Sequence, residues 1–89
     1  MARTGGYSDF HEPDALSKAV LTSNYDSIAV LDGLSGISKD DLLKNHSYAK
    51  QVVAGMNYKF RIINGSTYEV VIWHKLDGSY AVTSSSKVW

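Results

Sequence analysis

The second half of the chain alternates between apolar and polar side chains and is divided by short turn signals. Over residues 56–63, Met, Tyr, Phe and Ile alternate with Asn, Lys and Arg, which is the two-residue period of a half-buried antiparallel strand. Residues 67–74 and 79–83 are rich in β-branched and aromatic side chains, which favour strands. Because turn residues separate these runs at 64–66 and 75–78, the pattern predicts three successive strands in an antiparallel meander.

The first half of the chain has helical spacing instead. Pro13 and Asp14 supply an N-terminal signal, because proline is preorganised for a first turn and an acid complements the helix dipole. Gly33 supplies a stop. We therefore expect one long helix over residues 14–31, packed on one face of a four- to five-stranded antiparallel sheet in an α+β fold. Apolar and small side chains recur through it at intervals of three and four, namely Leu16, Ala19, Val20, Ser23, Ser27 and Val30.

Residues 51–55 separate two segments that both have strand character. Residues 47–50 precede them, and the alternating run follows. Only Gly55 permits a turn easily, so either one long strand passes through or a hairpin reverses at an apolar tip. Val52 and Val53 would be unusual at such a tip, because exposed valines invite association. Length and composition by themselves favour a buried strand.

Composition limits the kinds of partner. The 89 residues are 44% hydrophobic and 20% charged, which is typical of one ordinary globular domain. Lys plus Arg equals Asp plus Glu at 9 each, so charge gives no reason to expect nucleic acid or an anionic membrane as a partner. No apolar run approaches the roughly 20 residues of a membrane span. The absence of cysteine and of a signal-peptide core slightly favours a cytoplasmic location over secretion of a mature form.

Residues that carry catalytic or cofactor chemistry are sparse. The chain has no cysteine, which removes a thiolate nucleophile and thiolate metal ligands. His11, His46 and His74 are far apart and have no second ligand at metal-binding spacing. Neither a Gly-x-Ser-x-Gly elbow nor a Gly-rich phosphate loop occurs in the sequence. We therefore predict that the protein is not an enzyme and binds neither a metal nor a cofactor.

One five-residue segment is distinctive, Gln51-Val52-Val53-Ala54-Gly55. It resembles the first inhibitory hairpin loop of the cystatins, which inhibit papain-like cysteine peptidases. Two weaker features follow the order of that family, the pair Gly5-Gly6 near the N-terminus and the turn 75–78 after the loop. The resemblance extends over nearly all 89 residues. It implies a single cystatin-like domain over residues 1–89, with the long helix packed across the sheet.

The resemblance also decides how residues 34–46 are interpreted. Ser38 is a capping residue, and acids and a leucine pair come after it, which argues for a short helix. The cystatins would instead place a loop here, followed by a strand that begins near Leu42. We follow the family, because the strand 56–63 needs a partner and helical signals in so short a piece are weak.

By the resemblance, three segments would form a wedge that occludes the peptidase cleft without a covalent bond. The N-terminal segment would pivot at Gly5 or Gly6, and the first hairpin would contribute residues 51–55. The second turn would contribute the residues Leu76, Asp77 and Gly78.

The second turn departs from the usual cystatin pattern. Many members carry a Pro-Trp pair there, and this chain has none. Leu76 is similar to the leucine of the Leu-Pro pair in the stefin branch, with Asp77 in place of the proline. We expect Trp73, which lies on the preceding strand, to serve packing and not peptidase contact.

The sequence therefore predicts a monomer that inhibits papain-like cysteine peptidases reversibly and tightly. The alternative is a non-inhibitory interaction module of the same fold, or a domain-swapped dimer that exchanges strands across the first hairpin. The intact loop 51–55 favours inhibition, and the missing Pro-Trp pair favours the alternative.

Overall fold

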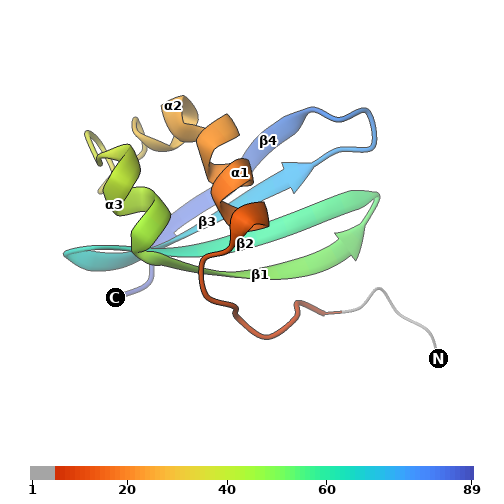
Figure 1. Cartoon of the computed structure of the whole chain (residues 1–89), viewed down its shortest axis with the longest axis horizontal. Coiled ribbons are helices and arrows are strands. Elements are labelled where there is room, and N and C mark those ends of the chain that lie inside the picture. Colours follow the sequence, from red (N-terminus) through yellow and green to blue (C-terminus); the bar gives the residue numbers. More distant parts are fainter. Residues whose placement is uncertain (1–5) are drawn as a thin grey trace.

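A computed structural model describes residues 6–89 of the chain. The strands form one antiparallel sheet in the order β1-β2-β3-β4, and the helices lie over the same face of it (Figure 1). The predicted α+β class and the antiparallel meander are confirmed. The elements of this part of the chain are α1 (Ala15–Ser23), α2 (Tyr25–Ile28), α3 (Lys39–Lys44), β1 (His46–Val53), β2 (Gly55–Asn64), β3 (Ser66–His74) and β4 (Tyr80–Lys87).

Alternate side chains on the helix-covered face of the sheet form the core. Phe60 and Ile62 from β2 and Val70 and Ile72 from β3 are fully buried. Full burial of one such side chain contributes about 1.5–3 kcal/mol relative to exposure, so this face holds sheet and helices together. The helices supply the buried residues Val20, Leu21, Ile28 and Leu42.

The helix expected over residues 14–31 is interrupted, so the prediction of one continuous helix is wrong. It begins as predicted, with Asp14 as N-cap accepting a hydrogen bond from the backbone nitrogen of Ser17 at 2.9 Å. At Asn24 the side-chain amide donates to the carbonyl oxygen of Val20 at 2.8 Å. Short polar side chains compete in this way for the backbone groups of a helix. The chain resumes helical geometry after Asn24 only for the single turn of α2.

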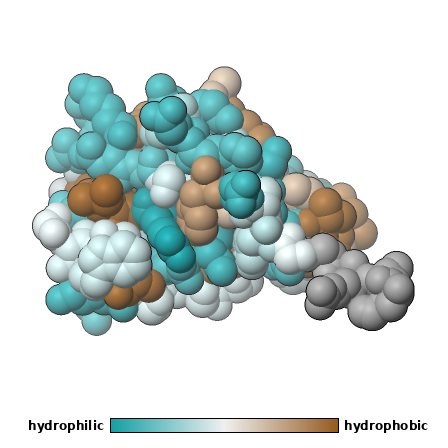
Figure 2. Space-filling view, turned by 90° about the horizontal axis from the view of Figure 1, so that it is seen from below, coloured by the Kyte–Doolittle hydropathy of each residue, from teal (hydrophilic) through white to brown (hydrophobic). Residues whose placement is uncertain are grey.

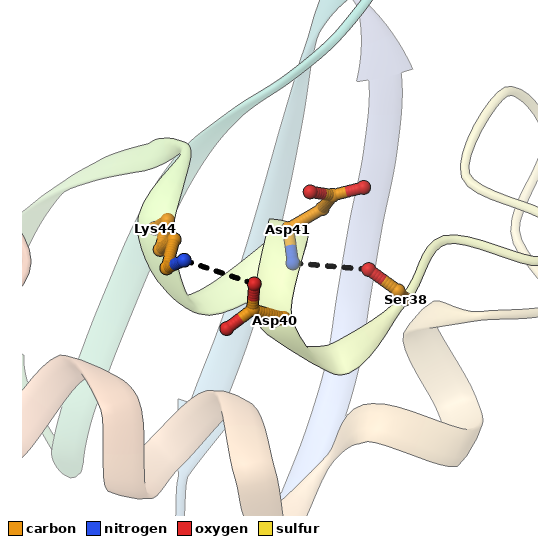
Figure 3. A network of polar contacts seen from close by, with 4 residues as sticks. All are labelled: Ser38, Asp40, Asp41 and Lys44. Atoms are coloured by element: carbon orange, nitrogen blue, oxygen red, sulfur yellow. Dashed lines mark hydrogen bonds and ion pairs between the residues drawn. The ribbon is translucent and has the colours of Figure 1, made fainter.

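Helix α3 occupies the place where a strand was predicted to begin near Leu42, and that prediction is also wrong. The hydroxyl of Ser38 accepts a hydrogen bond from the backbone nitrogen of Asp41 at 3.1 Å, and Lys44 pairs with Asp40 at 3.0 Å (Figure 3). Fully buried Leu42 anchors the short helix in the core. The capping signal at Ser38 therefore predicted this segment correctly, whereas the cystatin pattern predicted it wrongly.

The strand β1 begins only after α3, and the N-terminal segment lies along its outer edge. The eight residues of β1 pair with β2 along their whole length, so the sheet needs no earlier strand as a partner for β2. Ser8 donates its backbone N–H to the carbonyl of Lys50 at 2.8 Å. His11 and Tyr48 form an isolated antiparallel bridge. Within residues 6–89 the predicted four to five strands are therefore four strands and one bridge.

Candidate functional site

The two connections that were predicted to contact a peptidase lie at the same end of the sheet. In a meander, alternate connections share an end, and the β1–β2 and β3–β4 connections lie together at the right of Figure 1. The β2–β3 turn at Gly65 lies at the opposite end. The term hairpin end is used below for residues 51–55 together with residues 75–79.

The first connection reverses the chain within residues 53–55. Val53 is the last residue of β1 and pairs with Gly55, the first residue of β2, so that Ala54 alone lies between the strands. Of the two alternatives left open by the sequence, the hairpin is confirmed and the uninterrupted strand is wrong. Gln51 lies just below the tip, where its side-chain oxygen accepts a hydrogen bond from Asn57 at 3.2 Å.

The tip of this hairpin is apolar and exposed. The side chain of Val52 is 67% exposed, Ala54 is exposed, and Val53 and Gly55 are partly exposed. Figure 2 shows hydrophobic residues at the same right-hand end of the molecule, seen from the helix-free side. Apolar groups that a fold gathers in solvent are typical of interaction sites.

Gly55 is required at its position for two reasons. Its φ is +100°, a conformation that side-chain-bearing L-residues rarely adopt. A Cβ atom there would also lie 2.1 Å from the carbonyl oxygen of His74, at the end of β3. The missing side chain lets the tip of the first hairpin lie directly against β3.

The second connection is a polar turn with one exposed apolar side chain. The backbone closes with hydrogen bonds from Lys75 to Ser79 at 2.8 Å and from Gly78 to Lys75 at 3.0 Å. The carboxylate of Asp77 accepts from the backbone nitrogen and the hydroxyl of Ser79, and these bonds lower the pKa of Asp77. Leu76 is 81% exposed. The turn is thus held by its own hydrogen bonds and presents a leucine to solvent.

The third predicted segment is described only in part. Gly5 lies outside the described residues. Gly6 is exposed and has open space around it. Because Ser8 lies beside Lys50 and His11 beside Tyr48, the segment, followed from His11 back to Ser8, leads toward the hairpin end (Figure 1).

Tyr7 holds the N-terminal segment on the helix-free face of the sheet. The ammonium of Lys59 lies 4.1 Å from the centre of the Tyr7 ring, within the range of a cation–π contact. Burial, together with the charge of Glu69, raises the pKa of the Tyr7 hydroxyl. The segment is therefore attached to the sheet at the residue that follows Gly6.

Trp73 has a contact that the sequence did not predict. Its indole nitrogen donates a hydrogen bond to the carbonyl oxygen of Ala54 at 2.8 Å. The ammonium of Lys75 lies 5.4 Å from the centre of its ring. The expectation of packing within the strand missed this bond, although an indole N–H at a sheet surface usually finds an acceptor.

A buried serine–histidine pair lies elsewhere, between the helices and β1. The imidazole of His46 contacts the Ser17 hydroxyl through Nε2 and the Leu42 carbonyl through Nδ1, each at 2.9 Å. The carboxylate of Asp14 accepts a hydrogen bond from the Tyr48 hydroxyl at 2.6 Å. Because Ser17 is fully buried, no substrate reaches its hydroxyl, and the network joins α1, α3 and β1.

The same network shifts the ionisation of its members. Burial lowers the pKa of His46, because the charged imidazolium is poorly solvated there. Burial and the hydrogen bond to Asp14 raise the pKa of Tyr48 to about 12.

Within residues 6–89 no group of three or more His, Cys, Asp or Glu side chains converges on a metal-sized site. No helix in this part of the chain is long and apolar enough to cross a membrane.

A cavity of about 400 Å³ lies away from the hairpin end. It opens to solvent between the α2–α3 connection, the beginning of β3 and the end of β4, and it was not predicted. Its lining includes Asp32, Gly33, Tyr68 and Lys87. It shares no residue with the predicted wedge.

No family model matches the chain, and no characterised protein or solved structure was found to be similar to it.

Proposed function

We propose that the protein is a reversible, non-covalent inhibitor of papain-like cysteine peptidases with a cystatin-like fold. In this proposal the first hairpin, the second turn and the N-terminal segment occlude the cleft of the enzyme. The observation that carries it is the exposed Val52-Val53-Ala54 tip, held in place at the end of the sheet that also presents Leu76.

The physical argument concerns preorganisation. Peptidase clefts are concave and lined mostly by apolar groups, so an apolar tip of small side chains gains free energy by leaving water there. Binding is weakened by every flexible group that must become ordered. The tip is already constrained by the β1–β2 ladder and by the bond from Trp73. Little conformational entropy is then lost on docking.

The departures from the expected fold lie away from this end. Helix α3 precedes β1 at the end of the sheet where Ile62 pairs with His46, opposite the hairpin end. The break at Asn24 lies in the helical layer above the sheet. Neither feature alters the three segments of the proposed wedge.

The second turn limits the expected affinity. A buried tryptophan in an interface often contributes about 2 kcal/mol or more, and the turn has no tryptophan. By the relation of about 1.4 kcal/mol per tenfold change, the complex would be roughly 30-fold weaker than one with that contact. We therefore expect inhibition that is reversible and weaker than in members with the Pro-Trp pair.

The deciding experiment is a titration of papain and a cathepsin L-type peptidase with the protein. We expect progressive loss of activity at micromolar concentrations or below, with full recovery on dilution because no covalent bond forms. Full peptidase activity at micromolar protein would exclude the proposed function.

The alternative is a non-inhibitory module or a strand-exchanged dimer, and the missing Pro-Trp pair is the feature that favours it. In a dimer exchanged across the first hairpin, residues 53–55 would open and the tip would no longer exist. Size-exclusion chromatography at two protein concentrations would reveal the dimer, and the peptidase titration distinguishes a non-inhibitory monomer from an inhibitor.

A further inference from the structure

Ala54 has a carbonyl group that the sheet ladder does not use. It is the residue between the paired positions Val53 and Gly55, so neither strand supplies it with a partner in the register. The indole nitrogen of Trp73 donates to this carbonyl at 2.8 Å. A tryptophan N–H is a donor only, so the indole donates and the Ala54 carbonyl accepts.

This bond joins β3 to the connection between β1 and β2. Trp73 belongs to β3, which pairs with β2 but not with β1, and its partner across the ladder is Asn57. Its indole nevertheless reaches the tip between β1 and β2. Gly55 lets the start of β2 lie close to the backbone at the end of β3, because any side chain there would collide with the carbonyl of His74.

We propose that Trp73 is a positioning residue that holds the tip of the first hairpin in one conformation. The tip sequence Val-Ala-Gly has only the glycine as a turn-forming residue, so local sequence alone does not hold it. With the indole bond, the tip is tied to β3 as well as to its own ladder. Lys75, 5.4 Å from the ring centre, lies over the indole at cation–π range.

The consequence for binding rests on the proposed function. If the tip enters a peptidase cleft, Trp73 lowers the ordering cost of that step without itself needing to touch the enzyme. Losing such a constraint should change mainly the rate of dissociation, because most differences in affinity among related complexes are differences in dissociation rate. The role of Trp73 at the tip can be tested with the free protein, and its effect on binding with the complex.

The first measurement uses the unmodified protein. The chain has two tryptophans, and Trp89 serves as the internal control because it is 70% exposed. We expect the indole N–H of Trp73 to exchange with solvent several-fold more slowly than that of Trp89 in NMR spectra. Equal exchange of the two indole protons would overturn the proposal.

The second measurement compares Trp73→Phe with the control Trp89→Phe. Phenylalanine keeps an aromatic ring at position 73 but removes the donor. A net hydrogen bond corresponds to a factor of roughly 2 to 12 in an equilibrium. We expect amide exchange over residues 53–56 to accelerate by that factor in Trp73→Phe alone. Exchange that is unchanged at the tip, or faster across all of β3 and β4, would overturn the proposal.

The third measurement addresses binding. Dissociation of Trp73→Phe from the peptidase should be faster by a similar factor of roughly 2 to 12, with association within about twofold and with Trp89→Phe unchanged. A faster tip exchange without faster dissociation would remove the role of Trp73 in binding. If even the unmodified protein fails to bind, the proposed function fails, while the exchange measurements still decide the role of Trp73 at the tip.

Discussion

Val52 and Gly55 are three residues apart in the same hairpin, but different constraints act on them. Gly55 is required by its φ of +100° and by the nearby carbonyl of His74, so its identity follows from the backbone. Val52 is 67% exposed and pairs with Met56 through the backbone ladder. Nothing in the fold requires a valine side chain there. Its replacement therefore tests binding with little effect on folding.

We predict that Val52→Asp weakens peptidase inhibition by at least about tenfold, because an apolar subsite cannot solvate a carboxylate and burying an unpaired polar group costs more than about 1.4 kcal/mol. The free energy of unfolding should change by no more than about 0.5 kcal/mol, as for other surface positions. Inhibition constants and urea unfolding curves measure the two effects.

Val30→Asp is the matched control for this variant. Val30 is also highly exposed, but it follows α2 and lies outside the wedge. It should leave inhibition unchanged. Equal inhibition by both aspartate variants and the unmodified protein would show that the tip does not enter the cleft.

At the scale of elements, the sheet could be predicted from the sequence, and the helical layer only in part. Two-residue alternation places β2 with little ambiguity, because one buried face specifies the register, and the run of β-branched and aromatic residues places β3. The break at Asn24 depends on a competition between side-chain and backbone hydrogen bonds, which helical spacing does not record. For residues 38–44 the sequence contains the helix-capping signal at Ser38, but the cystatin pattern led to the prediction of a loop and a strand.

The candidate site was predictable to a similar degree. The exposed tip and the second turn could be located from their residues, and the meander then places them at one end. The bond between Trp73 and Ala54 could not be located, because it depends on where the β1–β2 connection lies relative to β3 and on the rotamer of the indole. The cavity lined by Asp32 and Lys87 likewise depends on how a loop lies over the sheet.

For the element that was predicted wrongly, we expect Ser38→Ala to lower the free energy of unfolding by about 1 kcal/mol. Loss of a helix N-cap typically costs about 0.5–2 kcal/mol, and the Ser38 hydroxyl accepts the bond from Asp41. Lys44→Gln removes the exposed pair with Asp40 and should cost only about 0.3–0.5 kcal/mol. Urea unfolding measures both variants, and a larger effect for Lys44→Gln would contradict the capping argument.

At the scale of the whole molecule, one buried polar network connects the helical layer to the sheet. Ser17 belongs to α1, the Leu42 carbonyl to α3, and His46 and Tyr48 to β1. The exposed residue Asp14 extends the network to the start of α1 through its bond from Tyr48. Buried polar groups with every partner in place make one arrangement of the layers preferable to others. Their protonation then affects the stability of the whole fold.

The free energy of unfolding should therefore fall between neutral and mildly acidic pH. Burial lowers the pKa of His46 from 6.5; the nearby charge of Lys18 acts in the same direction, whereas the Leu42 carbonyl and Asp14 oppose it. In the unfolded chain the His46 imidazole takes up a proton near pH 6.5, whereas in the folded protein the same imidazole is still neutral at that pH. The contribution of neutral His46 to the free energy of unfolding is thus complete above pH 6.5. It is lost as pH falls through the lower pKa of His46 in the folded state, by at most about 1.4 kcal/mol per pH unit. The pKa of Asp14 is also lowered, but from 3.8, so its contribution is lost only at more acidic pH.

Urea unfolding at pH 7 and pH 5 measures this loss. His46→Gln should be less stable than the unmodified protein at pH 7, because glutamine does not reproduce both imidazole contacts, and its stability should change less between the two pH values. A variant in which His11 and His74 are both replaced by glutamine keeps the network and should retain the loss. If His46→Gln shows the same decrease as the unmodified protein, the buried imidazole does not couple the helices and sheet to pH.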